Sequence, residues 1–379
     1  PGGPGAGRAH PCQHFPAGSG DTGGMNPTQD GRDTRERRVV GRVMRRLLPY
    51  LFLCYTVNYL DRVNVSFAAL EMTGDLGFTP AVFGLGAGMF FIGYVLFEVP
   101  SNLIMGVVGA RRWIARIMVT WGVLTSALAF VHTPAGFYGV RLLLGIAEAG
   151  FFPGIIFYLA HWIPARERAR ASALFLTSTA LSGVIGGPLS GFIMKLRGAH
   201  GLAGWQWLFL LEGLPAIVLG LVTLRFLDDR IADARWLAPA DRAWLERRLG
   251  AEHAAVRERR LHVAVPALAG AVGLALAALC RDRFPLGGFL ALCLAAAGIW
   301  STLGPFWSLP TVFLSGTAAA GGIALINSMG NAGGFVGPYA VGYVRDLTGS
   351  YAGGLWFLCA TLVAGSALSF TIRTDRRAG

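Results

Sequence analysis

Charged residues are scarce in this 379-residue chain: Asp, Glu, Lys and Arg make up 14% of it, while apolar types make up 54%. A soluble domain carries roughly 25% charged residues, so this balance excludes an ordinary soluble protein. The apolar residues form repeated runs of about 20 to 25, and about 20 suffice to cross a hydrocarbon core about 30 Å thick. We therefore predict an all-α polytopic membrane protein.

The chain also lacks the patterns of enzyme, cofactor and metal sites. Its five cysteines are scattered without a CxxC pair, which predicts neither a metal site nor a disulfide framework. Its glycine-rich stretches lie inside apolar runs rather than between a strand and a helix, so they are typical of helix packing and not of phosphate binding. His161 and His262 stand alone at the ends of runs, where an interfacial role is expected. We predict no enzyme activity, no cofactor and no metal.

Ten runs are long enough to span a bilayer, and their flanking charges predict an orientation. Seven arginines lie between residues 32 and 46, whereas Glu71 and Asp75 follow the first run without a basic residue. Because cytoplasmic loops are enriched in Lys and Arg, we expect both termini on the cytoplasmic side of the cell inner (plasma) membrane. Lys195 and Arg197 fall on the outer side and weaken this pattern without reversing it. The predicted spans are 47–70, 81–105, 113–132, 136–160, 171–195, 205–226, 263–280, 285–310, 317–343 and 352–372.

The polar stretches divide the chain into five parts. Within the first, Gly and Pro dominate residues 1–24, which cannot build a core, and Met25 is the expected start. The net charge of +12 follows from membrane topology, because nucleic-acid binding would need basic residues gathered on one soluble face. We predict no nucleic-acid partner. The parts are a disordered, basic cytoplasmic N-terminus (1–46), a six-helix bundle (47–226), a basic cytoplasmic loop (227–262), a second bundle (263–372) and a cytoplasmic tail (373–379).

Two of the apolar runs carry ionised residues near their middles: Asp61 with Arg62, and Arg141 with Glu148. A charge at the centre of a membrane helix costs about 2.5 to 3.5 kcal/mol, so such residues usually face a partner or a wet cavity. Seven residues nearly complete two helical turns, which places Arg141 and Glu148 on one face, about 10 Å apart along the axis. That face can line a conduit; the alternative is a buried ion-pair network that locks helices together.

Small residues surround the second pair of charges. Gly145 and Gly150 would let the next helix approach closely, and Pro153 would loosen the backbone beyond them. A similar glycine-proline cluster follows in the next run, with Gly183, Gly187, Pro188 and Gly191 at its centre. Both clusters predict close helix packing.

These motifs resemble those of a known family. Residues 141–154 resemble the fourth-helix motif of the major facilitator superfamily, and residues 183–191 resemble its fifth-helix motif. The anion:cation symporter branch of that family has sequences similar to those at residues 58–64, 97–102, 207–215 and 327–338. From about Arg46 to Ile372 the pattern is most similar to bacterial permeases described as tartrate transporters, with phthalate and hydroxyphenylacetate permeases close by. The resemblance implies a fold of two six-helix halves related by an internal repeat.

The resemblance also implies a mechanism in which organic anions enter with protons. By motif position, Asp61 and Glu148 would be the proton-coupling residues, and Arg62 and Arg141 would bind the anion. Arginine stays charged and can grip a carboxylate with two parallel hydrogen bonds. An anion bound to the arginine would compete with the neighbouring acid for it, which favours protonation of that acid.

Five further residues are candidates for substrate binding. Tyr59 and Tyr94 match positions that contact substrate in related transporters. Trp307 in the eighth predicted span, with Asn327 and Asn331 one turn apart in the ninth, would supply the opposite wall. The alternative is structural, because aromatic side chains in spans mostly pack and asparagines often bond between helices.

Two departures from the family pattern stand out. The loop after the second span, residues 105–112, keeps the arginines of a cytoplasmic latch motif but not its acidic residue. The second departure is the helix count, because six predicted spans are followed by four. The later spans resemble the ninth to twelfth helices of the family, so the seventh and eighth are absent and the join falls near residues 251–260. Since the seventh helix of this fold lines the substrate cavity, the loss could impair transport.

Three functions remain open. The first is a monomeric, proton-coupled importer of a small organic anion such as tartrate. The second is a transport-deficient relative that binds an anion as a sensor or is the product of an internal deletion. The third is an exchanger of one anion for another, in which the acids would matter less.

Overall fold

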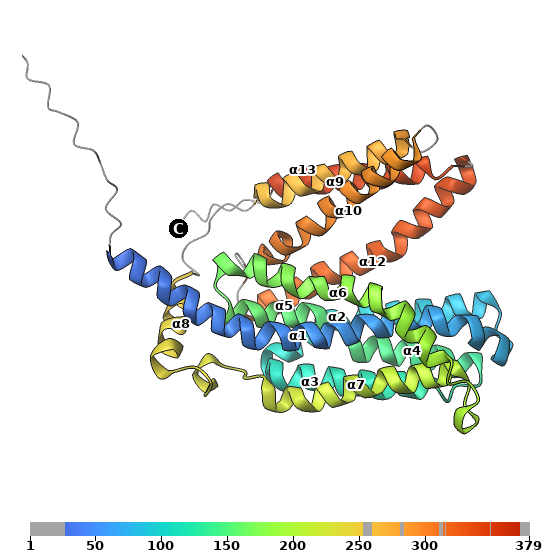
Figure 1. Ribbon diagram of the computed structural model, residues 1–379, viewed down its shortest axis with the longest axis horizontal. Helices are drawn as coiled ribbons and strands as arrows, with labels where there is room; N and C mark the ends of the chain where they lie inside the picture. Colours follow the sequence, from blue (N-terminus) through green and yellow to red (C-terminus); the bar gives the residue numbers. More distant parts are fainter. Residues whose placement is uncertain are drawn as a thin grey trace, which may run out of the picture.

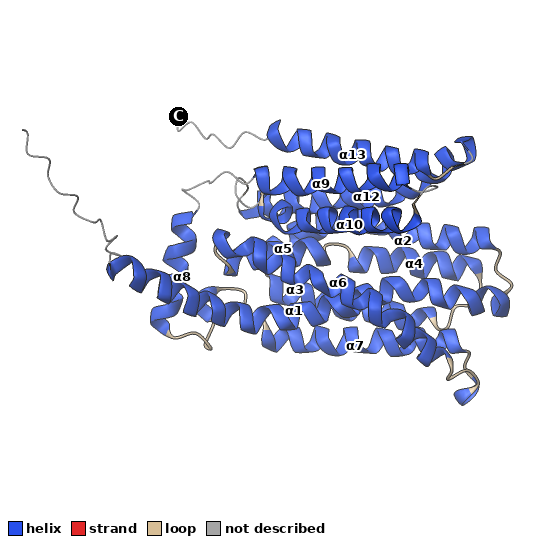
Figure 2. Cartoon of the chain, turned by 45° about the horizontal axis from the view of Figure 1, so that its top comes forward, coloured by secondary structure: helices blue, strands red, loops and turns tan. Residues whose placement is uncertain are grey.

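The computed structural model describes residues 27–252, 260–280, 284–310, 314, 316–348 and 350–371. These residues form α-helices and two short 3-10 turns, with no strand among them (Figures 1 and 2). The predictions for residues 1–24, Met25 and the tail 373–379 lie outside the described residues. The helices are α1 (Pro27–Leu76), α2 (Pro80–Val108), α3 (Ala110–Leu128), α4 (Pro134–Glu148), α5 (Phe151–Trp162), α6 (Ala165–Met194), α7 (Gly204–Phe226), α8 (Pro239–Glu252), α9 (Arg260–Cys280), α10 (Pro285–Ser308), α12 (Gly316–Thr348) and α13 (Ala352–Thr371).

The prediction of an all-α membrane protein is confirmed, and each of the ten predicted spans falls largely on helix. Within the described residues, seven helical stretches are long and apolar enough to cross a membrane. One of these, Pro134–Trp162, includes both α4 and α5, so the predicted fourth span is helical but interrupted. The division into six spans followed by four stays a prediction, and its join overlaps residues 253–259, which lie outside the described part.

The sequence sets two helix starts with the same Thr-Pro pair. The Thr79 hydroxyl accepts a hydrogen bond of 3.2 Å from the Val82 N–H, and the Thr133 hydroxyl accepts one of 3.2 Å from the Gly136 N–H. The following proline opens each helix, where its missing N–H leaves no intrahelical bond unmade. These caps fix where α2 and α4 begin.

The first seven helices form one packed group, with α3 and α7 side by side along one edge (Figure 1). Glycine permits this approach: a Cβ at Gly213 would lie 2.6 Å from the carbonyl oxygen of Gly122. Large aromatic side chains fill the interior, among them the fully buried Trp121, Trp162 and Trp205.

The later helices form a second group in which α9 packs against α10 and α13 (Figures 1 and 2). Glycine again allows a close crossing, since a Cβ at Gly298 would lie 2.7 Å from the Cα of Gly270. The two groups meet where α12 packs on α2 and α5, and where α10 packs on α6. The region around the buried charges therefore has walls from both groups.

The glycine-proline cluster of α6 contacts α1 on one face. Pro188 lies inside α6 without ending it, and Gly187 meets Phe67 at an ordinary 3.5 Å. No described atom lies within 4 Å of a Cβ placed at Gly183 or Gly191, whereas one at Gly186 would lie 3.2 Å from Leu60 of α1, so the close approach at Gly183 and Gly191 stays a prediction. One turn before Gly186, the Ser182 hydroxyl donates to the Thr56 carbonyl on α1 at 3.1 Å.

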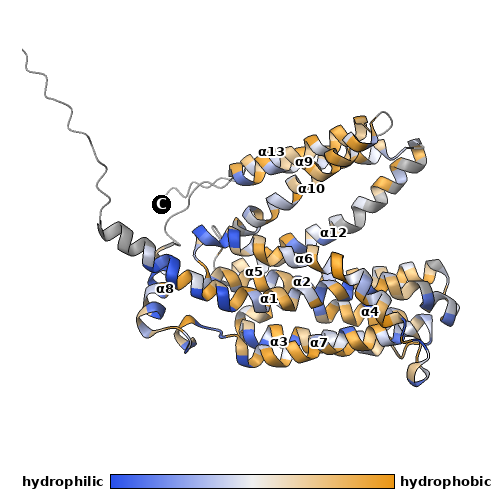
Figure 3. Cartoon of the chain, in the orientation of Figure 1, coloured by the Kyte–Doolittle hydropathy of each residue, from blue (hydrophilic) through white to orange (hydrophobic). Residues whose placement is uncertain are grey.

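Polar residues gather on α8 and the adjoining part of α1 (Figure 3). Asp241 of α8 pairs with Arg42 at 3.4 Å and with Arg35 at 3.7 Å. This part of the basic central loop is thus docked on α1 rather than fully solvated.

An acid absent from the latch motif is supplied by another loop. The Arg111 backbone N–H donates to Asp229 Oδ1 at 2.8 Å, and the Arg111 guanidinium lies 3.6 Å from Asp229 Oδ2. Asp229 follows α7, so the contact ties the start of α3 to the loop after α7. The arginines kept in the motif therefore have a partner within the same group of helices.

Candidate functional site

The fourth predicted span breaks directly after Glu148. Ala149 leaves the helical conformation, and Gly150 has φ +89°, in the left-handed region that favours glycine. The break therefore precedes Pro153, which lies in the first turn of α5 and needs no N–H there, so the loosening that we expected from Pro153 begins at Gly150 instead. Glu148 becomes the last residue of α4, with a second helix starting three residues later.

The predicted close approach is present on both sides of this break. A Cβ at Gly145 would overlap the backbone of Phe90 on α2, and one at Gly150 would lie 2.6 Å from the Ser101 hydroxyl. Glycine at both positions lets α4 and the break lie directly on α2, which positions Glu148 against α1.

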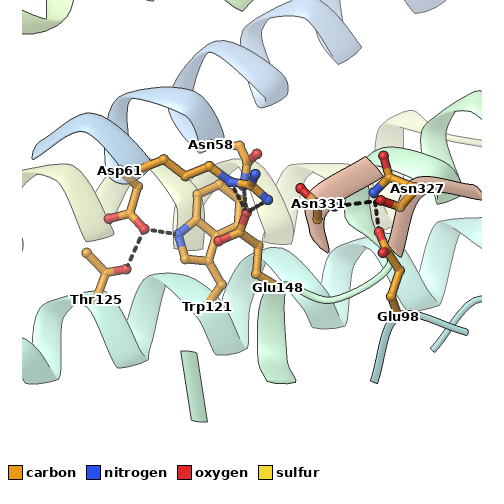
Figure 4. Close-up of polar contacts among 9 residues, drawn as sticks. Asn58, Asp61, Glu98, Trp121, Thr125, Glu148, Asn327 and Asn331 are labelled. Atoms are coloured by element: carbon orange, nitrogen blue, oxygen red, sulfur yellow. Dashed lines mark hydrogen bonds and ion pairs between the residues drawn. The ribbon is translucent and has the colours of Figure 1, made fainter. Parts of the chain in front are cut away.

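Glu148 is fully buried and is bound by two residues of α1 (Figure 4). Arg62 Nη2 lies 2.6 Å and Arg62 Nε 2.8 Å from Glu148 Oε1, and Asn58 Nδ2 donates to the same oxygen at 2.8 Å. Glu148 Oε2 is buried and accepts no hydrogen bond from the described residues. One carboxylate oxygen is therefore saturated and the other is unused.

The two arginines both lie near one aromatic ring. The guanidinium of Arg141 lies 4.8 Å from the Phe90 ring centroid, and that of Arg62 lies 5.6 Å from the same centroid and 4.8 Å from the ring of Tyr94. Such cation–π contacts attract a guanidinium without neutralising its charge. The two cations thus lie around one ring, and neither is neutralised by it.

Arg141 is not the ion-pair partner of Glu148, although both lie on α4 as predicted. Its Nε donates to the Gly86 carbonyl at 3.3 Å, and no carboxylate of the described residues lies within 4.0 Å of it. Arg141 is 6% exposed, whereas the Arg62 side chain is 23% exposed. In this conformation Arg62 is the more accessible of the two cations.

Asp61 lies in a separate polar cluster facing α3 (Figure 4). Its Oδ2 accepts hydrogen bonds from Trp121 Nε1 at 2.9 Å and from the Thr125 hydroxyl at 3.1 Å. Its Oδ1 accepts one from Asn64 Nδ2 at 3.2 Å, and the same amide also donates to Glu212 of α7. Adjacent residues of α1 therefore serve two clusters: Arg62 joins Glu148, and Asp61 faces α3 and α7.

The predicted asparagines of α12 lie at the contact between the two helix groups (Figure 4). Asn327 Nδ2 donates to Glu98 Oε1 on α2, and the Ser328 hydroxyl donates to Glu98 Oε2 at 2.6 Å. Asn331 Nδ2 donates to the backbone carbonyl of Asn327 at 3.1 Å. Both asparagines thus bond to other protein groups, as expected if they have a structural role. Their role in substrate binding stays a prediction.

The predicted aromatic residues differ in what they contact. Trp307 is buried and makes an edge contact with Phe152 of α5, with ring centroids 4.9 Å apart, so it joins α10 to α5. Tyr94 is buried beside Arg62, whereas Tyr59 is partly exposed with its ring centroid 6.5 Å from that of Tyr55. Tyr94 therefore adjoins the charged centre, and Trp307 lies at a packing contact.

Two buried acids were not among the predicted site residues. Glu98 lies in the second span and Glu212 in the sixth, and both side chains are buried. The cost of a charge inside a membrane helix, which singled out Asp61 and Glu148, applies equally to them. Scanning every predicted span for acids would have found both.

Buried cations and acids on the inner faces of an all-helical membrane bundle are typical of membrane transport proteins. The comparison of sequences agrees with that class. The chain belongs to the Major Facilitator Superfamily, whose sequence profile matches residues 51–376.

Individual relatives are transporters. Two proteins of Agrobacterium vitis, each described as a "Putative tartrate transporter", are 42% identical over 413 residues, and the matches cover 89% of this chain and 95% or 92% of the relative. A "Quinolone resistance transporter" of Acinetobacter baumannii is 36% identical over 413 residues, covering 89% of this chain and 95% of that protein. The resemblance to tartrate transporters is thereby confirmed at the level of the family and its relatives.

These alignments contain gap positions on the side of this chain. The match to the first Agrobacterium vitis protein runs over 413 residues, but 89% of 379 residues is about 337, so about 76 positions of the relative have no counterpart here. Two membrane helices of about 20 to 25 residues with their connections require a segment of that order.

Solved structures show the same fold at low identity. The proton:xylose symporter XylE bound to 6-bromo-6-deoxy-D-glucose matches with a TM-score of 0.67 at 11% identity, covering 88% of this chain and 96% of that chain. The human organic anion transporter MFSD10 matches with a TM-score of 0.56 at 14% identity, covering 89% of this chain and 99% of that chain. At these identities the likeness defines the fold alone.

Proposed function

We propose that the chain is a secondary transporter that takes up a small organic anion, such as tartrate or a related carboxylate, together with protons. The anion binds at Arg62 and Arg141, and Glu148 and Asp61 carry the protons. The carboxylate chemistry is supported by the two buried cations and by the two Agrobacterium vitis relatives.

The observation that carries this proposal is the unequal use of the two Glu148 oxygens. Oε1 accepts hydrogen bonds from Arg62 Nε and Asn58 Nδ2 and forms an ion pair with Arg62 Nη2, while Oε2 is buried and accepts no hydrogen bond from the described residues. A substrate carboxylate that takes over the Arg62 guanidinium removes the counter-ion of Glu148. A buried carboxylate without a counter-ion is costly, so Glu148 then takes up a proton, for which Oε2 is the free position. Anion binding and protonation are coupled through one arginine.

Access to the site fits this order of events. Arg62 is the partly exposed member of the pair and Glu148 is sealed, so an anion meets the arginine before it meets the acid. A planar guanidinium can bind a carboxylate with two parallel hydrogen bonds, which a lysine cannot match. Arg141, which contacts the same Phe90 ring as Arg62, would bind a second carboxylate or hydroxyl of the same anion.

Transport in proteoliposomes tests the role of Glu148. We expect wild-type protein to accumulate tartrate when the outside is acidic, and Glu148→Gln to lose this accumulation while still exchanging internal for external anion. Glu246→Gln, an exposed change on α8, is the matched control and should behave as wild type. Loss of exchange together with uptake in Glu148→Gln would show that Glu148 is not a pure coupling residue.

We also infer the membrane arrangement: six spans, a cytoplasmic loop and four spans, with both termini cytoplasmic in the plasma membrane and the seventh and eighth family helices missing. The gap of about 76 positions against the relative supports the missing pair. It also favours a second candidate, a chain that binds the anion at Arg62 and Arg141 but does not complete transport. Anion binding by purified protein without any uptake or exchange would establish that candidate, and trans-stimulation without proton dependence would establish an exchanger.

A further inference from the structure

Glu212 is a buried acid that takes no part in the coupling between Arg62 and Glu148. It lies in α7 with a side chain that is 6% exposed. Asn64 Nδ2 donates to its Oε2, and the Ser190 hydroxyl donates to its Oε1 at 3.4 Å. Because Asn64 Nδ2 also donates to Asp61 at 3.2 Å, one amide group joins the two carboxyl groups.

Neither of these acids has a counter-ion. Among the described residues, no Lys, Arg or His nitrogen lies within 4.0 Å of Asp61 or Glu212, in contrast to Glu148, which has Arg62. An ionised carboxylate buried without a cation costs several kcal/mol, and a proton removes that cost. Two such acids joined by one neutral amide form a pair suited to holding one proton between them.

The linking amide has a spare acceptor. Asn64 is fully buried, and its Oδ1 accepts no hydrogen bond from the described residues. If the amide turns over, this oxygen can accept an O–H from one acid while the N–H group still donates to the other. Asn64 can therefore form hydrogen bonds to both acids when both are ionised and when one of them is protonated.

Asp61 and Glu212 face each other across α1 and α7. One nitrogen, Asn64 Nδ2, donates to both carboxyl groups, so the two bonded oxygens lie within two hydrogen-bond lengths of each other. The ends of the two helices also meet, because Trp205 Nε1 of α7 donates to Asp75 of α1 at 3.1 Å.

The groups around Glu212 are mostly neutral. Asp61 of α1 is the ionisable side chain that acts on it electrostatically. The helix α6 presents a serine, and α3 presents Trp121 and Thr125 to Asp61. Charged side chains reappear at the surface end of α1 and α7, namely Glu71, Asp75 and Arg197.

We propose that Glu212 is a second proton-carrying carboxyl group that exchanges its proton with Asp61. This inference rests on the proposed proton-coupled transport and adds a residue to it. In the transfer, the O–H bond of Glu212 breaks and an O–H bond forms on the Asp61 carboxylate, so the charge of the pair is unchanged. The transporter then has two proton stations: the Asp61–Glu212 pair facing α7, and Glu148 beside the anion-binding arginines.

Infrared difference spectroscopy of the purified full-length protein, with and without tartrate and across pH, tests this directly. Glu212→Gln keeps hydrogen-bonding groups for Asn64 and Ser190 but cannot carry a proton. We expect wild type to show a carboxylic C=O band that is lost in Glu212→Gln and retained in Glu246→Gln, an exposed control. In proteoliposomes, Glu212→Gln should lower proton-driven uptake at least about tenfold, which is the factor that a proton gradient of one pH unit supplies. Anion exchange should be retained.

A second variant separates proton sharing from packing. Asn64→Leu keeps both acids but removes the group that joins them, so it should also reduce proton-driven uptake and shift the C=O band. An unchanged band and unchanged uptake in Glu212→Gln would overturn the inference, as would parallel loss of uptake and exchange. If wild type itself moves the anion without protons, the proposed function fails, and the C=O band still decides whether Glu212 holds a proton.

Discussion

Replacing Gly150 with alanine tests whether the break after Glu148 is required. An L-residue in the left-handed region costs about 1 to 2 kcal/mol, and Gly150 has φ +89°. The added methyl group would also lie 2.6 Å from the Ser101 hydroxyl and 2.7 Å from Asn102 Nδ2, both of them buried. Overpacking of this kind costs about 1 to 3 kcal/mol. The two effects together predict a destabilisation of roughly 2 to 5 kcal/mol.

Gly139 supplies the matched control for this substitution. It lies in the same helix as Glu148, is exposed, and has no described atom within 4 Å of an added Cβ. Alanine there should be neutral or stabilise by up to about 1 kcal/mol, because glycine is a poor helix former.

Thermal unfolding of the purified protein, followed by intrinsic tryptophan fluorescence, measures the difference between the two variants. Gly150→Ala should unfold roughly 3 to 8 °C below Gly139→Ala. It should also transport more slowly, because relief of the clash moves the end of α4 and with it the Glu148 carboxylate. Equal stability and equal transport in the two variants would refute the structural role assigned to the break.

Three further substitutions test other parts of the site. Arg141→Lys should weaken apparent anion affinity about tenfold or more, as expected for loss of one charge-assisted hydrogen bond. Unchanged affinity would contradict bidentate binding of the anion by Arg141. Asp229→Ala should cost about 1 kcal/mol of stability with transport retained, since its pair with Arg111 is partly exposed; lost transport would mean that the contact acts as a latch. Glu98→Ala should lower the unfolding temperature more than Glu98→Gln, because it leaves the buried Ser328 hydroxyl without its acceptor at about 1 to 3 kcal/mol; equal unfolding temperatures would contradict the bridge between α2 and α12.

The sequence predicted the helices well because a membrane span has a strong local signal. Length and apolar content pick out seven helical stretches of the described residues, including the interrupted one. The position of the interruption was less accessible. Pro153 suggested a weak point, but the backbone leaves the helix at Ala149 and Gly150, and that position depends on how tightly the segment packs on Ser101 of α2.

The buried charges show a similar limit. Their cost in a membrane identified Asp61, Arg62, Arg141 and Glu148 from sequence alone. Spacing within one helix suggested that Arg141 and Glu148 act together, and they do share α4, but the ion pair joins Glu148 to Arg62 of another helix. No periodicity relates residues on different helices, so this pairing needed the structure.

The direct measurement of coupling is the internal pH of proteoliposomes loaded with a fluorescent pH indicator, after tartrate is added outside without an imposed proton gradient. The proposed mechanism predicts that wild-type protein acidifies the interior as the anion enters, and that Glu148→Gln does not. Entry of tartrate at the wild-type rate without internal acidification would contradict proton coupling through Glu148.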